Sequence, residues 1–183
     1  MRLRRKTRFN WSTDATPRMM RILAIDPGTR IMGYADFEDY HLIDYGLKLF
    51  KPATKIENLL NDIQNVFERL ILEKQPSLII LEKNRFSQIT NNIRLTLAIA
   101  RIKTVAKEHS VRLIEYAPNT VRSVISNNGY ATKSELSRAV VNRYPELRIY
   151  VQNQSPSSLN TFFNITDAVA CGLTYLDLIS KTP

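Results

Sequence analysis

The chain has 183 residues, of which 44% are hydrophobic and 23% are charged. This size and composition are typical of one soluble globular domain with a sizeable core, with room for a tail. The formal net charge of +9 and the isoelectric point near 9.8 favour a polyanionic partner. No run of about 18 apolar residues is recognisable, so no membrane span is predicted.

The first 20 residues carry much of the positive charge. They contain six basic residues against one acidic residue. They are not followed by an apolar segment of the signal-peptide type. We therefore expect residues 1–19 to be a basic, flexible extension and residues 20–181 to form the folded domain.

The single cysteine, Cys171, excludes an intramolecular disulfide framework and a zinc site built from several cysteines. It lies within an apolar run, which predicts a buried packing role. A lone cysteine of this kind suits a reducing cytosol.

The stretch Arg21–Asp26 is a short apolar run that ends in an acid, and the turn signal Pro27-Gly28 follows at once. This pattern predicts a buried strand with a carboxylate at its last position. An unpaired buried carboxylate costs several kcal/mol. Asp26 therefore either accepts local hydrogen bonds from the amides of Gly28 and Thr29 or holds a cation.

The hydrophobic pattern predicts further strands and helices along the chain. Strands are expected over residues 31–37, 41–49, 78–81 and 111–116. Helices are expected over residues 55–75, 90–109, 121–125 and 133–144, and from about Thr166 onward. Thr132 and Glu135 have the spacing of a capping box, and residues 152–163 are expected to form a loop.

A second buried strand, residues 78–81, also delivers an acid, Glu82, at its carboxyl end. Three antiparallel strands followed by two helix–strand units predict an α/β fold, a five-stranded mixed sheet with helices on both faces. Ligands of open sheets lie at the carboxyl ends of the strands. Both Asp26 and Glu82 fall there.

A third acid, Asp167, lies near the C-terminus, with Asn164 three residues before it. The two side chains share one face if the last helix already includes residue 164. Two strand-end acids and a helix acid cannot stay ionised together without cations. Mg²⁺ is the hard, oxygen-seeking candidate, and two such ions would clamp the attacking and leaving oxygens of a phosphodiester displacement.

From Arg21 to about Leu178 the sequence resembles the RuvC family of Holliday-junction resolvases, within the RNase H-like nuclease superfamily. The resemblance rests on an ordered set of segments, namely Ile25-Asp26-Pro27-Gly28-Thr29-Arg30 with Gly33-Tyr34, Ile80-Leu81-Glu82 with Lys83-Asn84, Glu115-Tyr116-Ala117-Pro118, Asn128-Gly129 with Lys133, and Thr166-Asp167-Ala168-Val169-Ala170. A lone Asp-Pro-Gly-Thr also resembles the phosphate loop of sugar kinases and actin-like ATPases. The full ordered set is specific.

The resemblance implies that Asp26, Glu82 and Asp167 are catalytic carboxylates that bind metal. Lys133 matches the family's essential basic residue near the scissile phosphate, where it could stabilise charge that develops in the transition state. A lysine near a helix start is disfavoured by the helix dipole, so the position of Lys133 has no structural motive.

A second group of residues is expected to face DNA, and it comprises Lys83, Arg85, Phe86, Arg122, Tyr130 and Lys133. Phe86 and Tyr130 are the candidates for stacking on bases, whereas a solvated charge is the usual role of a residue such as Lys83. Arg122 stands where the family often has lysine. Phe86 follows Glu82 by four residues, where the family spacing is three.

The family's terminal motif usually offers two acids three residues apart, and this chain has Asn164 at the first position. An amide oxygen can coordinate Mg²⁺ but brings no charge, which would shift the metal affinity or weaken the enzyme. An N-cap of the last helix is an equally good role for an asparagine. Both roles stay open at this point.

The resemblance implies a homodimeric, Mg²⁺-dependent endonuclease that nicks four-way DNA junctions symmetrically, with two ions per active site and Mn²⁺ able to substitute. It also implies branch-migration proteins as partners and the helix over residues 90–109 as a dimer face. A cytoplasmic location in a bacterial or phage context is expected, and organellar targeting by residues 1–19 stays open.

Two alternatives remain. One is a YqgF-type RNase H-like nuclease that acts on ribosomal RNA precursor, although that family lacks the segments around Glu115 and Asn128 in this form. The other is a non-catalytic junction-binding protein whose site decayed at Asn164.

Overall fold

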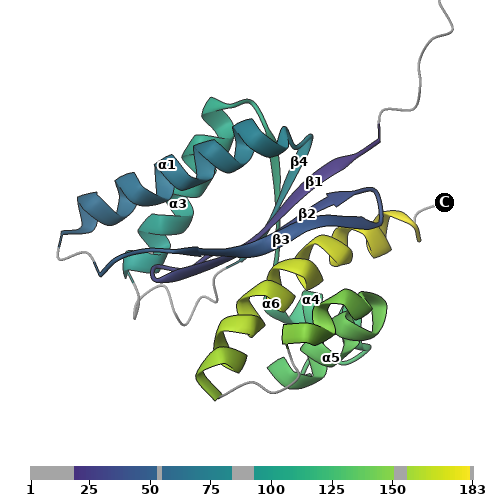
Figure 1. Ribbon diagram of the computed structural model, residues 1–183. Coiled ribbons are helices and arrows are strands. Elements are labelled where there is room, and N and C mark those ends of the chain that lie inside the picture. Colours follow the sequence, from purple (N-terminus) through teal and green to yellow (C-terminus); the bar gives the residue numbers. More distant parts are fainter. Residues whose placement is uncertain (1–18, 53–54, 84–92, 151–155, 182–183) are drawn as a thin grey trace, which may run out of the picture.

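The computed structural model describes residues 19–52, 55–83, 93–150 and 156–181 (Figure 1). Its centre is a five-stranded sheet of order β3-β2-β1-β4-β5. The strands are β1 (Arg21–Asp26), β2 (Ile31–Glu38), β3 (His41–Leu49), β4 (Leu78–Glu82) and β5 (Arg112–Tyr116). The pairs β1–β2 and β2–β3 are antiparallel, and the pairs β1–β4 and β4–β5 are parallel. The predicted mixed sheet is confirmed.

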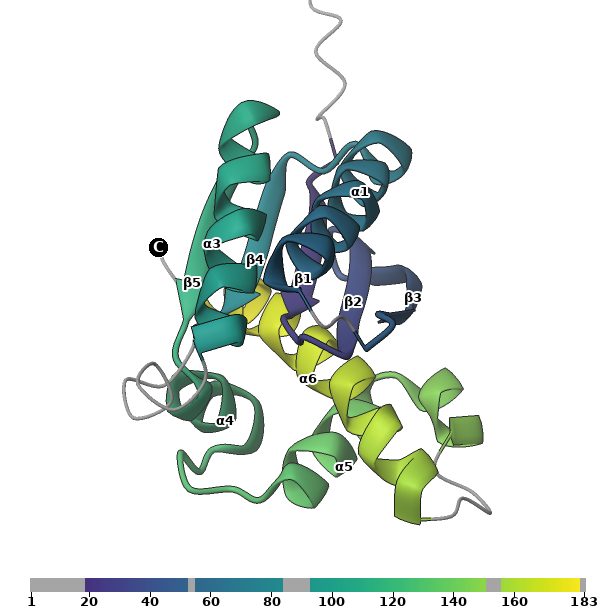
Figure 2. The same cartoon turned by 90° about the vertical axis from the view of Figure 1, so that its left-hand side faces the viewer.

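Helices cover both faces of this sheet, as predicted. They are α1 (Ile56–Lys74), α3 (Ile93–Glu108), α4 (Pro118–Ser126), α5 (Lys133–Arg143) and α6 (Pro156–Ile179), with a short 3₁₀ helix η1 (Pro145–Tyr150). Figures 1 and 2 show α1 and α3 on one face and α4, α5 and α6 on the other. The sheet therefore separates two hydrophobic cores.

The alternation of side chains along β1 divides its residues between the two cores. Ile22 and Ala24 pack on the face covered by α6, whereas Leu23 and Ile25 pack on the face covered by α1 and α3. Successive side chains of a strand point to opposite faces. The last residue, Asp26, therefore projects toward the α6 side.

The start of α6 corrects the sequence interpretation. Residues 152–163 were expected to form a loop and the last helix to begin near Thr166, but the helix begins at Pro156. Proline is accommodated in the first turn of a helix, where its missing N–H has no intrahelical acceptor. Burial of Phe162 and Ile165 in the core then outweighs the weak helix propensity of the Ser and Asn residues nearby.

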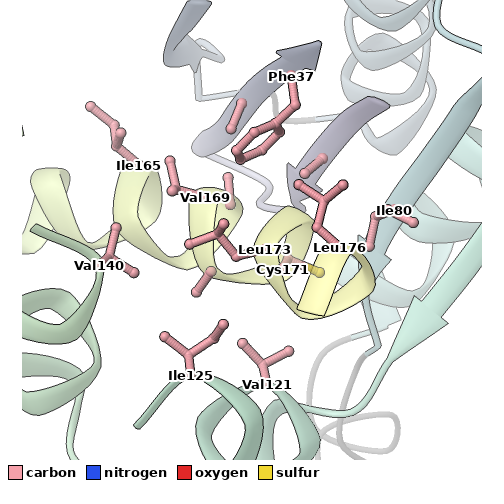
Figure 3. Packing of buried hydrophobic residues seen from close by; sticks show 14 of the residues in the cluster. Phe37, Ile80, Val121, Ile125, Val140, Ile165, Val169, Cys171, Leu173 and Leu176 are labelled. Carbon is pink, nitrogen blue, oxygen red and sulfur yellow. The ribbon is translucent and has the colours of Figure 1, made fainter. Parts of the chain in front are cut away.

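α6 is a core helix, and Figure 3 shows it between Phe37 of β2 and Val121 and Ile125 of α4. Its Thr161–Ile179 segment reaches a mean hydropathy of 1.3, so it is long and apolar enough to cross a membrane, but 67% of it is buried inside the protein. The sequence interpretation missed this apolar stretch. Packing against the sheet accounts for its composition.

Two glycines let α6 lie directly on the sheet. A Cβ atom added at Gly33 of β2 would overlap the backbone oxygen of Asn164 on α6. A Cβ atom added at Gly172 of α6 would overlap the ring of Phe37 and lie 3.1 Å from the Cβ of Ala24. The helix backbone and the sheet therefore touch where other residues would hold them apart.

The structure confirms most of the helix boundaries and caps predicted near α4 and α5. The side-chain oxygen of Thr132 accepts from the backbone N–H of Glu135, and the Glu135 carboxylate accepts from the Thr132 N–H, so the capping box is present. α4 begins at Pro118 rather than at Val121 because proline itself occupies its first position. The 3₁₀ helix η1 was not expected.

At the amino end of β1 a buried charge is well paired. Asp36 of β2 is fully buried, and the Arg21 guanidinium donates two hydrogen bonds of 2.7 Å to its carboxylate. Bidentate pairs of this kind combine strength with fixed geometry. This end of β1 is stabilised by ionic contacts.

Some expectations lie outside the described residues. They include the basic extension over residues 1–18 and the first turn of the helix expected from residue 90. The division into an extension and a folded domain stays a prediction.

Replacing Gly33 with alanine is expected to destabilise the protein by about 1–3 kcal/mol, the usual cost of overpacking a filled site. The clashing atom is backbone, so it cannot rotate away. The measurement is the free energy of unfolding in urea. Gly129→Ala is the control, since its added Cβ would lie 3.5 Å from the nearest atom, and equal stabilities for the two variants would contradict this reasoning.

Candidate active site

Two acids lie at the carboxyl ends of neighbouring parallel strands. Asp26 and Glu82 each follow the Ile25–Leu81 register pair by one residue. The side chain of Ile80 packs on the α6 face, so the alternation sends Glu82 to that face as it does Asp26. The expectation that strand ends bring these two acids together agrees with the register.

A third acid reaches the same place from α6. The Asp167 side chain is only 8% exposed, and its charge helps to raise the pKa of Asp26, so the two carboxyl groups interact. Asn164 lies three residues earlier, inside the helix, and its amide nitrogen donates to the Thr161 carbonyl at 3.3 Å. The N-cap role considered for Asn164 is therefore wrong, because α6 starts eight residues before it.

The pKa of Asp26 is raised well above its ordinary value. Burial is the main cause, and the charges of Asp167 and Glu82 add to it, whereas the Lys133 charge opposes the shift. The pKa of Asp167 is also raised by burial, against the charge and hydrogen bond of Lys133 and the charge of Arg122. The acids repel one another, and nearby cations only partly compensate.

Cys171 lies one turn after Asp167 on α6, and the negative charges of the same three acids act on it. It is fully buried, as predicted. Burial raises the pKa of its thiol, and the charges of Glu82, Asp26 and Asp167 raise it further. The sulfur therefore stays a protonated packing group behind the acids.

Lys133 makes the closest ionic contact with the cluster. It is the first residue of α5, and its Nζ donates to an Asp167 carboxylate oxygen at 2.9 Å. Burial lowers the pKa of Lys133, but the charges of Asp167, Asp26 and Glu82 outweigh that effect and leave the pKa raised. The sequence offered no structural motive for a lysine at this helix start, and the acid cluster supplies one.

Arg122 of α4 is a second cation near the acids, since its charge lowers the pKa of Asp167. Its Nε is buried and has no hydrogen-bond partner among the described residues. A buried unsatisfied donor is costly. This donor is therefore free to meet an anionic group such as a phosphate, which a guanidinium suits.

The donor set has the chemistry of a magnesium site. Carboxylate oxygens and an amide oxygen are hard ligands of the kind that Mg²⁺ prefers. Within the part of the chain that the structure describes, no three His, Cys, Asp or Glu side chains stand close enough together to hold a metal ion. The residues are of the right chemical type and lie in the right region to bind such an ion. The acid side chains must move closer together before they can ligate it.

The residues expected to face DNA are only partly described. Lys83 is exposed just after Glu82, and its backbone N–H donates to the Tyr116 carbonyl at 2.8 Å. Arg85 and Phe86 lie outside the described residues, so their roles stay predictions.

Tyr130 is 96% exposed in the turn between α4 and α5. It borders a hollow of about 400 Å³ whose other lining residues are Asn119, Thr120, Ser123, Val124 and Gly129. The sequence interpretation missed this hollow and its hydroxyl and amide groups. Only the Asn128-Gly129 signal pointed toward it.

Comparison with known proteins identifies the family that this chain resembles. The family model described as crossover junction endodeoxyribonuclease RuvC matches residues 22–175. The RuvC protein of Gloeobacter violaceus is 32% identical over 126 residues, which cover 66% of this chain and 73% of that protein. The RuvC protein of Akkermansia muciniphila is 30% identical over 163 residues, which cover 86% and 90%.

Solved structures agree on the fold. A Thermus thermophilus RuvC in complex with a Holliday junction substrate superposes with a TM-score of 0.70 at 16% identity, covering 89% of this chain and 97% of that one. At this identity the likeness concerns the fold alone, and it supports the α/β architecture with a five-stranded mixed sheet expected above. The family model spans the three acids and Lys133, and on that match the chain belongs to the RuvC family of crossover junction endodeoxyribonucleases.

Proposed function

We propose that this protein is a metal-dependent endonuclease that resolves four-way DNA junctions by paired, symmetric nicks. The observation that carries the proposal is the convergence of Asp26, Glu82 and Asp167 from β1, β4 and α6 beside Lys133. The named RuvC relatives are crossover junction endodeoxyribonucleases, which favours this activity over the YqgF-type alternative.

The proposed cofactor is Mg²⁺, with two ions per site and Mn²⁺ able to substitute. Bound ions would activate the attacking water and stabilise the leaving oxygen, which is the usual contribution of a two-metal site. In this proposal Asp26, Glu82 and Asp167 hold the ions, and the Asn164 amide oxygen is a neutral additional ligand. Two strand ends and a core helix carry their backbones and so hold the three side chains near one another.

The basic residues act on the phosphate. In the cleavage step the water loses a proton and its oxygen bonds to phosphorus, while the bond from phosphorus to the 3′-oxygen breaks and that oxygen gains a proton, which leaves a 5′-phosphate and a 3′-hydroxyl. Among the described residues, Lys133 and Arg122 are cations whose charges act on Asp167, and they would stabilise the charge that develops on the phosphate oxygens. Arg122 offers a planar fork of donors for this purpose, whereas a lysine would offer a point charge.

A homodimer would match the two-fold symmetry of a four-way junction. Ile93 and Leu97 lie one turn apart on α3 and are 69% and 38% exposed. An exposed apolar pair on one helix face supports α3 as the dimer face. Branch-migration proteins remain expected partners.

Asp26→Asn is expected to lower junction cleavage at least about a hundredfold, because the site loses a charged ligand worth several kcal/mol in the transition state. The measurement is the nicking of a synthetic four-way junction in Mg²⁺, compared with linear duplex and RNA. Asp62→Asn, at an exposed position of α1, is the control and should cleave normally.

Retained activity in a folded Asp26→Asn protein would refute the site assignment. Tight junction binding by the wild type without any nicks would instead support the non-catalytic alternative.

Asn164→Asp is expected to lower the Mg²⁺ concentration that gives half-maximal cleavage, because a charged ligand replaces a neutral one. A Mg²⁺ titration of the cleavage rate measures it. Asn142→Asp adds the same charge at an exposed position of α5 and should leave the titration unchanged. Identical curves for all three proteins would place residue 164 outside the metal site.

Tyr130→Ala is expected to weaken junction binding by about 1–3 kcal/mol, the usual worth of one stacked base. Tyr130→Phe keeps the ring and should bind as the wild type does. Equilibrium binding at one fixed salt concentration, with the Asp26→Asn change in every protein to prevent cleavage, measures the effect. Unchanged binding by the alanine variant would exclude stacking at Tyr130.

A further inference from the structure

Lys133 places its positive charge beside the acid cluster Asp26, Glu82 and Asp167, which is also the place proposed for the metal ions. Its Nζ is 2.9 Å from the Asp167 carboxylate oxygen. The charges of Asp26 and Glu82 act on the same ammonium group, since both help to raise its pKa. Lys133 is therefore paired with Asp167 and also lies within the electrostatic reach of Asp26 and Glu82.

The acids cannot lie together uncompensated, because like charges at short range disfavour joint ionisation. Lys133 and Arg122 are the cations whose charges lower the pKa of Asp167, and Lys133 alone of the two also lowers that of Asp26. The positive charge of Lys133 therefore offsets the negative charge of both Asp26 and Asp167.

We propose that Lys133 is the counter-ion of the metal-free site and competes with the divalent cation for Asp167. This inference rests on the metal site of the proposed function. Metal binding and the Lys133–Asp167 ion pair compete for the same carboxylate, so each weakens the other by the same factor.

The two partners differ in their freedom to move. The Asp167 side chain is 8% exposed on a helix packed into the core, whereas the Lys133 side chain is 54% exposed. Lys133 also has a flexible four-carbon stem, and the helix start that carries it disfavours a cation. The lysine therefore leaves while the acid stays, and the released ammonium group becomes available to a phosphate.

The test is calorimetric titration of the DNA-free protein with Mg²⁺ and, separately, Mn²⁺ at constant ionic strength. Lys133→Met removes the charge and keeps most of the stem. It is expected to bind both ions at least about fivefold more tightly than the wild type, within the usual range for coupled ligands. Lys133→Arg keeps the charge and should stay near the wild-type affinity.

Lys103→Met is a closely matched control. Lys103 of α3 pairs with Glu115 of β5 at 2.8 Å, and its side chain is 43% exposed. Glu115 pairs in register with Leu81, whose side chain packs on the α3 side of the sheet. Loss of this ion pair removes the same charge without touching the acid cluster, so the metal affinity should not change.

Thermal unfolding gives a second readout that does not involve cleavage. In EDTA, Lys133→Met should melt at a lower temperature than the wild type, because its acids lack their counter-ion. Added Mg²⁺ should raise its melting temperature more than it raises that of the wild type, since tighter binding to the folded state stabilises it further.

Unchanged or weaker metal binding by Lys133→Met overturns the proposal, as does the absence of metal binding in both proteins. Metal binding by the variant alone supports it strongly. Because no DNA is present, failure of junction cleavage would leave this result intact. Normal cleavage by the wild type with equal metal affinities would reject the competition and spare the proposed function.

Discussion

The direct contact between α6 and the sheet is the constraint on which both the core and the candidate site depend. Gly33 and Gly172 remove the side chains that would separate them. α6 supplies much of the core on its face of the sheet through residues such as Val169 and Leu173. It also carries Asp167, so the carboxylate is held by the packing that holds the domain together. A side chain supported in this way keeps its position without help from loops.

The charges of the protein are arranged in opposite ways at the two ends of β1. At the amino end, the buried Asp36 is matched by the two hydrogen bonds of Arg21. At the carboxyl end, Asp26 shares its surroundings with other acids, and its pKa is raised by burial and by their charge. If the proposed metal site is correct, the free protein stores unfavourable repulsion among its ligands, and the rest of the fold offsets it.

Much of this arrangement could be predicted from local pattern. Apolar runs with a single terminal acid located Asp26 and Glu82 at the carboxyl ends of buried strands, because buried strands have a distinctive composition and length. The capping box at Thr132 follows from its spacing of three residues to Glu135. These features depend on short-range chemistry that the sequence displays directly.

The features that could not be predicted depend on contacts between distant residues. The first turns of α6 contain Pro156 and several polar residues, and only the burial of Phe162 and Ile165 against other elements favours a helix there. The ion pair of Lys133 with Asp167 joins residues 34 positions apart. No local spacing encodes such a pair. For Lys133 the local pattern showed only the absence of a structural reason, and its expected role came from the resemblance to the RuvC family.

The chemical state of Cys171 has a practical consequence for following the protein in solution. Its thiol is buried, and burial together with the neighbouring acids raises its pKa, so in the folded protein it is a poor nucleophile toward maleimides. A cysteine introduced at an exposed position such as Leu72 of α1 would react alone. Fluorophores can therefore be attached at chosen sites without first removing the natural cysteine.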